Sequence, residues 1–270
     1  MTSCLLAIIA GALYGFPVDV VEGSERVPSE TVKVGSIQFE PKTKTIYLDG
    51  FMNLSGGFVE YLVNLPSANA HECLVAVDCD PANFQTALML LDLKESRSPE
   101  SNRDLGPLDD GDRVVIFLQF AIEDAEGRTL IRTIRAENCI INAPMEREMA
   151  RCGFAFTGSG FMKIDPPPSA PEGTPPKEEF MARVTGELIS LSHRPWAILD
   201  NPLALPYTDG DYFAYSDVLP KMRRNEQRAQ PPSVRVILRK ASSFEIDASA
   251  VRMELPKLEA TPADEAEEDR

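Results

Sequence analysis

Residues 71–93 read HECLVAVDCDPANFQTALMLLDL, and this stretch carries the strongest structural signals in the chain. Its first part is apolar enough for a strand that is buried on both faces. Asp80-Pro81 then combines a capping carboxylate with a proline at the first helical position. Apolar residues follow at the i, i+3, i+4, i+7 spacing of one helix face: Phe84, Ala87, Leu88 and Leu91. We therefore predict a strand over 71–78 and a helix over 81–93 that packs against a sheet.

The segments around this stretch have the composition of β-strands. A hairpin is expected where Glu40-Pro41-Lys42 separates 32–39 from 43–50. Further segments rich in branched and aromatic residues are also predicted to form strands: 56–65, 113–122, 129–141, 154–164 and 180–192. A last strand at 233–240 is expected at the edge of the sheet. The sequence therefore predicts an α+β fold that is predominantly β-sheet, with one sheet-packing helix.

One domain over 31–240 accommodates this order of elements. A proline-rich loop interrupts it at 165–177, where residues 166–176 contain six prolines. Proline cannot donate to a sheet ladder, so we expect this loop to be exposed, stiff and polyproline-like.

The N-terminal part of the chain has the composition of an export signal. The apolar run Cys4–Phe16 is too short to span a membrane, which takes about 20 residues, and Ala10-Gly11-Ala12 offers a cleavage site. No Lys or Arg precedes the run, so a buried N-terminal strand or helix is the alternative. We interpret residues 1–15 as a signal segment and 16–30 as a polar leader, and we expect export to the periplasm or the cell envelope.

The charge distribution excludes some partners and indicates others. The chain has 27 Lys and Arg against 42 Asp and Glu, a net charge of -15, which disfavours binding to nucleic acid. Residues 241–270 hold nine acids and three bases, and we expect an acidic, mostly disordered tail. Residues 221–240, in contrast, hold seven bases and one acid. The basic residues expected to contact an anionic surface, an anionic polymer or the acidic tail are Lys221, Arg223, Arg224 and Arg228; a solvated loop is the alternative.

Cysteine usage points to buried free thiols. The five cysteines are Cys4, Cys73, Cys79, Cys139 and Cys152. A strand that holds both Cys73 and Cys79 keeps them too far apart for a disulfide, whereas a Cys139–Cys152 bond remains an alternative. Because no CxxC occurs, neither a zinc ribbon nor a common iron–sulfur run is indicated. We expect no cofactor.

The candidate site residues lie on two predicted strands. Glu60 interrupts an otherwise apolar strand, and His71-Glu72 opens the next one. A Glu60–His71 pair, or a pair between Glu72 and an arginine, would hold the strands in register. The alternative is general acid–base work by Glu60, His71 and Glu72. Alternation along a strand would place His71 and Cys73 on one face, so these two are the candidate metal ligands.

Two other motifs are incomplete. Thr157-Gly158-Ser159-Gly160 lacks the first glycine of a nucleophile elbow, so Ser159 is not expected to be a catalytic nucleophile. Asp109-Asp110-Gly111-Asp112 starts like a calcium loop, but Phe120 stands where the closing glutamate is needed. We expect a turn into the next strand there.

The stretch from Ile46 to Leu93 resembles the YdjY-domain family of bacterial exported or envelope proteins. The pattern of that family is a hydrophobic strand, a Gly-x-x-Glu segment, a His-Glu pair that opens the next strand and a proline-capped helix. The matching positions in this chain are Gly57, Glu60, His71, Glu72 and Pro81. Later segments are also similar: Phe156 to Ser159, 186–190 and 200–202. The resemblance covers roughly residues 32–240 and implies an exported protein without an assigned activity. Some members of the family carry ferredoxin-type segments, and the missing four-cysteine run puts such a role in doubt here.

These observations favour an exported α+β module with a binding or structural role and without catalysis. One alternative is a hydrolytic enzyme that uses Glu60, His71 and Glu72. Another is a redox accessory protein built on Cys73 and Cys79.

Overall fold

The computed structural model describes most of the predicted domain. The described residues are 30–54, 56–101, 103–205, 213–216, 218–219 and 231–247. The signal segment, the leader except its last residue, and the basic residues Lys221 to Arg228 lie outside this set. Of the acidic tail, only 241–247 falls within it.

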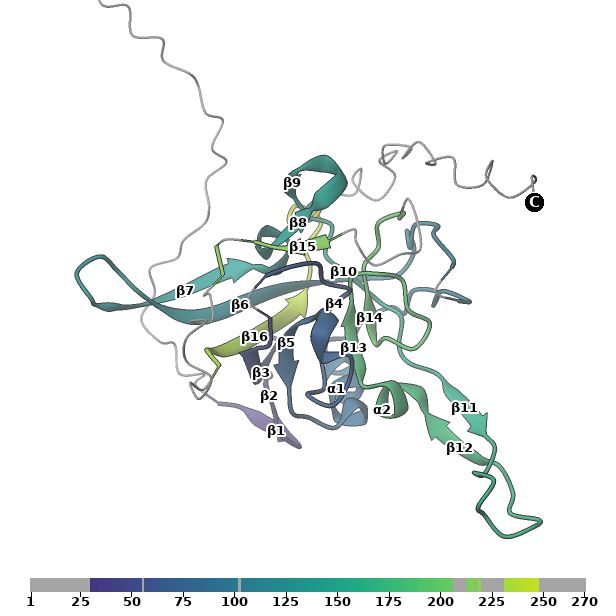
Figure 1. The fold of residues 1–270 in the computed structure, drawn as a ribbon. Coiled ribbons are helices and arrows are strands. Elements are labelled where there is room, and N and C mark those ends of the chain that lie inside the picture. The colour runs from purple at the N-terminus through teal and green to yellow at the C-terminus, as the bar shows by residue number, and fades with distance from the viewer. Residues whose placement is uncertain are drawn as a thin grey trace, which may run out of the picture.

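Eight strands of the main sheet close on themselves as a barrel (Figure 1). Around the barrel they are β3 (Thr45–Met52), β16 (Ser233–Lys240), β6 (Arg113–Glu123), β10 (Phe154–Phe156), β14 (Leu199–Asp200), β13 (Glu187–Ser190), β4 (Tyr61–Asn64) and β5 (Cys73–Val77). The pairing of β5 with β3 completes the ring, and only the β14–β13 and β4–β5 pairs are parallel. The predominantly β character is confirmed, but the sequence pattern gave no indication that the sheet closes.

Shorter elements extend from this barrel. The main sheet continues into β1 (Val32–Val34) and β2 (Ile37–Glu40) beside β3, and β7 (Thr129–Arg135) pairs with β6. A separate hairpin is formed by β11 (Phe161–Ile164) and β12 (Lys177–Phe180). A small sheet has the order β15 (Phe213–Tyr215), β8 (Ile140–Asn142), β9 (Arg147–Glu148). The helical elements are α1 (Pro81–Met89), α2 (Met181–Thr185) and the 3-10 turns Ala70–Glu72, Ala136–Cys139 and Ala143–Met145.

The predicted helix is confirmed as α1, which ends slightly earlier than expected. The Asp80 carboxylate accepts a hydrogen bond from the Ala82 N–H at 2.9 Å, and Pro81 is the first helical residue. The predicted apolar stripe is buried: Phe84, Ala87, Leu88 and Leu91. α1 packs against β1, β2 and α2.

The last strand, β16, is central rather than at an edge, so that prediction is wrong. It pairs with β3 on one side and with β6 on the other over nearly its whole length. Its charged residues alternate with buried Val234, Val236 and Leu238. A strand with one solvated face tolerates such charges between two neighbours.

Four of the predicted strands are interrupted in the structure. The segment 129–141 divides into β7 and β8 around the 3-10 turn Ala136–Cys139, and 154–164 divides into β10 and β11. The other two are broken by a turn or a helix. The first, at 32–39, folds into the β1–β2 hairpin because Gly35 adopts a left-handed φ of 64° in the turn. The second, at 180–192, begins as helix α2. The Ser159 hydroxyl accepts a hydrogen bond from the Ala182 N–H in the first turn of α2, and Gly186 ends it at φ 76°.

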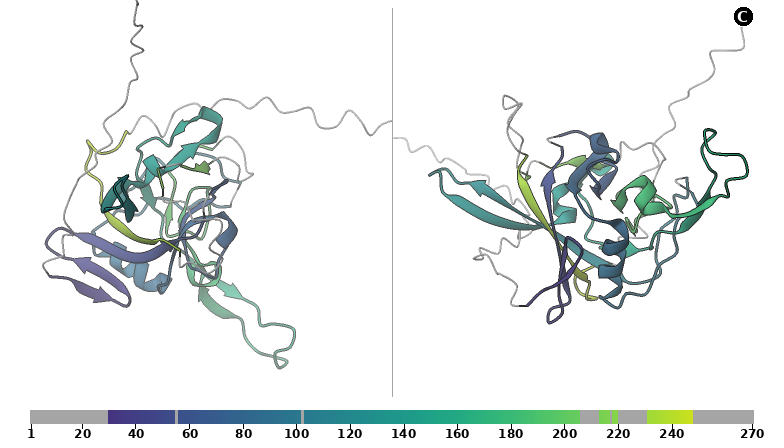
Figure 2. Two further views of the ribbon diagram at one scale, coloured as in Figure 1. Left: turned by 60° about the vertical axis from the view of Figure 1, so that its left-hand side comes forward. Right: turned by 90° about the horizontal axis from the view of Figure 1, so that it is seen from below.

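The proline-rich loop is exposed, as expected, and joins β11 to β12 at the end of a projecting hairpin (Figure 2). Its backbone is not a continuous polyproline helix. The Ala170 N–H donates to the Pro167 carbonyl and the Thr174 N–H donates to that of Pro171, so two successive turns form. The β6–β7 hairpin projects on the opposite side of the barrel (Figure 2).

Within the described residues, no helix combines the length and the apolar character that crossing a membrane requires.

Candidate functional site

The structure gives different partners to the side chains that the sequence grouped together, although the Glu60 N–H donates a hydrogen bond to the Glu72 carbonyl at 2.9 Å. His71 and Glu72 belong to a 3-10 turn and not to strand β5. The His71 side chain is 78 % exposed, and its Nε2 lies 3.4 Å from the Glu72 carboxylate. Cys73 is buried on β5, where its thiol contacts the Val75 carbonyl. The expected shared face of His71 and Cys73 is therefore absent, because alternation begins only where the strand begins.

Glu60 has a different partner from those expected. Its carboxylate accepts a hydrogen bond from the Arg194 guanidinium, which comes from the loop after β13. The same loop is held by backbone bonds from Leu191 and Ser192 to the Glu60 carbonyl. Arg194 also lies over the Tyr61 ring, with 5.3 Å between the guanidinium carbon and the ring centroid. Glu60 thus fixes a loop to β4, which is a structural role of the predicted kind with another partner.

A second acid–base pair, fully buried, joins this loop to β14. His193 Nδ1 is 3.4 Å from the Asp200 carboxylate, and both side chains are 0 % exposed. Asp200 also accepts hydrogen bonds from the Arg194 and Asn201 N–H groups, at 3.2 and 2.8 Å. Burial raises the pKa of Asp200, and these hydrogen bonds act in the opposite direction. We call Glu60, His193, Arg194 and Asp200 the buried cluster.

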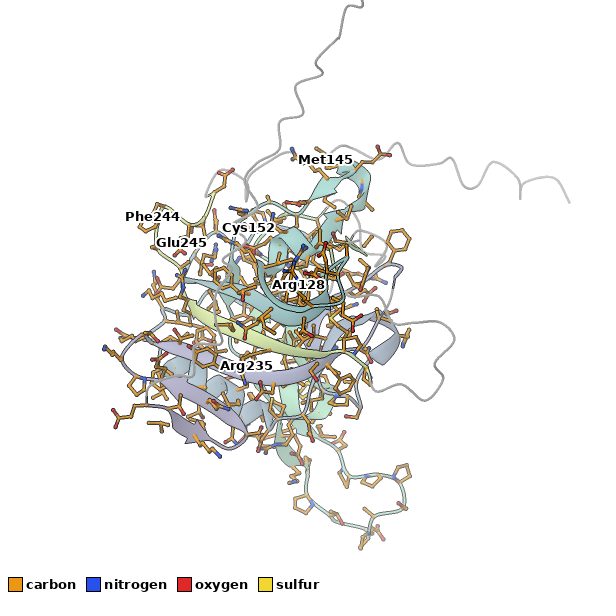
Figure 3. All side chains as sticks on the ribbon, turned by 90° about the vertical axis from the view of Figure 1, so that its left-hand side faces the viewer. Arg128, Met145, Cys152, Arg235, Phe244 and Glu245 are labelled. Atoms are coloured by element: carbon orange, nitrogen blue, oxygen red, sulfur yellow. The ribbon has the colours of Figure 1, made fainter. Side chains whose placement is uncertain are left out.

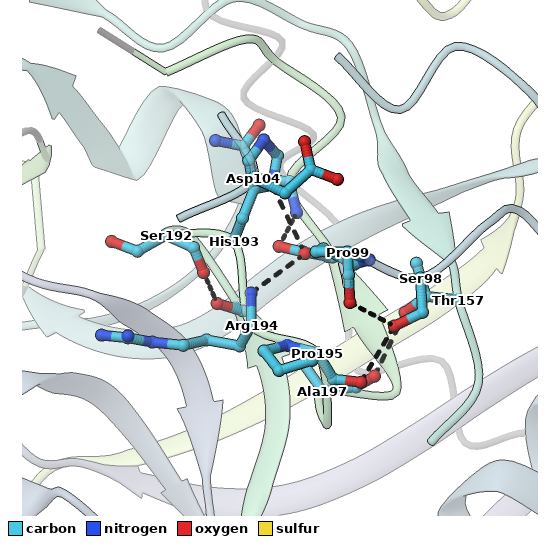
Figure 4. Close-up of polar contacts among 12 residues, drawn as sticks. Ser98, Pro99, Asp104, Thr157, Ser192, His193, Arg194, Pro195 and Ala197 are labelled. Atoms are coloured by element: carbon cyan, nitrogen blue, oxygen red, sulfur yellow. Dashed lines mark hydrogen bonds and ion pairs between the residues drawn. The ribbon is translucent and has the colours of Figure 1, made fainter. Parts of the chain in front are cut away.

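The connection between α1 and β6 is hydrogen-bonded to the loop that carries His193 and Arg194 (Figure 4). Ser98 donates a hydrogen bond to the Pro195 carbonyl at 2.9 Å, and the Leu108 N–H donates to Pro202 at 3.0 Å. Asp104 is close enough to His193 to interact with it electrostatically, and it is paired with Arg97 at 2.8 Å. His193 Nε2 has no hydrogen-bond partner among the described residues. Because the His193 side chain has no solvent-exposed surface, a substrate cannot contact its imidazole in this conformation.

The described cysteines are free and buried, as expected from the sequence. Burial raises the pKa of Cys73 to about 12, and burial with the nearby Asp78 and Asp80 charges raises that of Cys79 to about 12. Cys139 and Cys152 are also free thiols, so the alternative of a bond between them is not realised. A thiolate is the reactive form of cysteine, and it is scarce in all these environments at neutral pH.

A cleft of about 560 Å³ lies between the β6–β7 sheet and the chain that follows β16. The sheet contributes Phe117, Thr133, Ile134 and Arg135. Asn138, from the 3-10 turn after β7, and Arg151, from the segment between β9 and β10, also line the cleft. The opposite wall is Phe244 to Asp247, which we call the strap. Figure 3 shows Phe244 and Glu245 where the chain leaves the yellow β16.

Ion pairs hold the strap in place. The Arg239 guanidinium binds the Glu245 carboxylate, with a 2.7 Å bond from Nη1, and the Ser242 hydroxyl donates to it at 2.5 Å. The Arg239 side chain lowers the pKa of Glu245 to about 2. Arg135 donates to the Glu245 carbonyl and also binds the buried Glu137 at 2.8 Å. The first residues of the predicted acidic tail are therefore ordered against the barrel.

The two arginines of the cleft differ in whether their guanidinium groups have partners. Arg135 is fully engaged, and only 9 % of its side chain is exposed. Arg151 is partly exposed, and none of the hydrogen bonds or ion pairs among the described residues involves its guanidinium. Arg151 is thus a cation available to a ligand.

Sequence reasoning missed both the buried cluster and the cleft. The chain has only two histidines, so His193 within His193-Arg194-Pro195 was the available signal for the cluster. No short sequence motif predicts the cleft, because the residues that line it come from segments that are distant in the sequence. Ser159 caps α2, and Asp109 to Asp112 form the turn into β6 that the sequence predicted.

No family model, no curated protein and no solved structure matches this chain.

Proposed function

We propose that this protein is a non-catalytic binding module and that the cleft is its binding place. The observation that carries the proposal is the contrast between sealed acid–base groups and a formed, partly charged cleft. Cavities of a few hundred Å³ with apolar walls and a few polar groups are typical of ligand sites. The resemblance to YdjY-domain proteins and the N-terminal composition add the further proposal that the module works outside the cytoplasm.

The hydrolytic alternative has little support. Glu60 is committed to Arg194, and His71 and Glu72 contact each other at the surface, so the three do not converge on one reacting atom. The redox alternative is weakened by the raised thiol pKa values of Cys73 and Cys79. The expected contact of Lys221, Arg223, Arg224 and Arg228 with an anionic surface remains a proposal, since these residues lie outside the described ones.

Native mass spectrometry of the full-length protein, purified from its own cells, tests the binding function. We expect a bound species in the native spectrum that is lost on denaturation and that the Arg151→Gln variant retains less well. The variant Arg132→Gln, which changes an arginine of β7 outside the cleft lining, is the matched control. A wild-type mass equal to that of the bare chain, from several growth conditions, would contradict the proposal.

A further inference from the structure

Both walls of the cleft carry apolar side chains. Phe117 and Ile134 come from the sheet, and Phe244 and Ile246 come from the strap. Phe244 is 88 % exposed. An aromatic side chain this exposed forfeits the free energy that its burial would provide, roughly 2 kcal/mol or more. A ligand that covers Phe244 would recover part of that free energy.

Among the residues that the structure describes, the charges of the cleft leave one unmatched positive group. Glu245 is neutralised by Arg239, and Arg135 by Glu137. Asp247 is engaged in an interaction of its own. Arg151 is the remaining cation, and its planar guanidinium can bind a carboxylate or a related anion through two parallel hydrogen bonds.

The surroundings limit how much negative charge a ligand can carry. The whole chain has a net charge of -15, which repels polyanions at a distance. One available cation compensates one anionic group, while the strap carboxylates beside it disfavour a second. The size of the cleft fits a small molecule and not a folded partner.

We propose that the cleft binds a small amphiphilic anion, in which one carboxylate, sulfonate or phosphate group is attached to an aromatic or branched apolar body. Arg151 receives the anionic group, and Phe117 and Phe244 enclose the apolar body. This inference rests on the proposed binding function and specifies the ligand class.

Two dyes of nearly equal shape test the inference on the full-length protein. 8-Anilinonaphthalene-1-sulfonate carries the anion, and N-phenyl-1-naphthylamine lacks it. In fluorescence titrations, Arg151→Gln should lower the affinity for the anionic dye by about tenfold or more, which is the effect of losing a charged hydrogen bond. The affinity of the same variant for the neutral dye should stay within about twofold of wild type. Phe244→Ala should lower the affinity for both dyes. Arg132→Gln is the control and should change neither affinity.

Each departure from this pattern overturns the inference. Equal binding of the anionic dye by wild type and Arg151→Gln rejects Arg151 as the anion receptor. No binding of either dye by wild type rejects the cleft as a site for this class, and loss of both dyes in Arg151→Gln indicates a collapsed cleft instead of a missing charge. The binding function itself fails separately, when native mass spectrometry finds no retained species. A retained cationic or polyanionic ligand would refute the ligand class and leave the binding function standing.

Discussion

The buried cluster and the cleft each contain arginine and acidic side chains, yet they differ in what those charges can do. Arg194 is 17 % exposed, has Glu60 as its partner and ties a loop to the barrel. Arg151 is partly exposed and unpaired among the described residues, and it borders a volume of about 560 Å³. A paired, buried charge contributes to the fold, whereas an unpaired charge beside a cavity is available for recognition. The same residue type therefore carries different roles, and its environment decides between them.

The largest expected effect comes from breaking the buried cluster. Arg194→Met leaves the Glu60 carboxylate largely buried without its cation, and we expect a loss of about 3 kcal/mol in the free energy of unfolding. Urea unfolding followed by circular dichroism measures this loss. The control is Arg235→Met, which removes an exposed pair with Asp49 and should cost less than about 1 kcal/mol. Equal losses in the two variants would remove the distinction between the cluster and the surface.

The strap is expected to contribute stability that depends on pH. The folded-state pKa of Glu245 is about 2, below its ordinary value of 4.5, so its contribution is fully present above about pH 4.5 and is lost as the pH falls toward 2. Glu245→Gln should cost roughly 2 kcal/mol at pH 6, after allowance for solvent screening, and almost nothing near pH 2. Urea midpoints of both proteins between pH 2 and 6 give the comparison. A difference that does not change with pH would show that the Arg239 pair does not hold the strap.

Arg151 should matter little for folding. Arg151→Gln removes no described hydrogen bond or ion pair, so we expect its free energy of unfolding to stay within about 0.5 kcal/mol of wild type. Urea unfolding of the dye-binding variants provides this measurement directly. A loss comparable to that of Arg194→Met would place Arg151 among the structural arginines.

His71 is expected to show the smallest effect of the predicted site residues. With 78 % of its side chain exposed, His71→Ala should change the free energy of unfolding by less than about 0.5 kcal/mol. Thermal unfolding at pH 7, with wild type alongside, is sufficient to detect a larger change. A clear destabilisation would restore the register-holding role that the sequence suggested for this residue.

Local signals predicted the parts of the fold that depend on neighbouring residues. Helix α1 followed from Asp80, Pro81 and a single apolar stripe, and β6 and the first part of the next predicted strand, β7, followed from their branched and aromatic residues. These signals act over one or two turns of chain, where capping and periodicity dominate.

Contacts between distant segments were not predictable in the same way. Glu60 was correctly singled out as a residue needing a partner, but that partner, Arg194, is separated from it by most of the domain. Likewise, Met181 to Thr185 was placed in a predicted strand, although Met, Ala and Arg are good helix formers, and it becomes helical where Ser159 caps it and Gly186 ends it. A helix this short depends on such contacts, because its few residues make little helical hydrogen bonding of their own.

The sequence by itself determined the β-rich composition, the capped helix, the exposed proline loop and the free thiols, since each depends on local chemistry or on hydrophobicity alone. Only the tertiary structure decided that the sheet closes, that β16 lies between β3 and β6, and which arginine is left unpaired beside a cleft. These features depend on which distant strands pair and on which charges that pairing brings together, and one-dimensional periodicity contains no information about either.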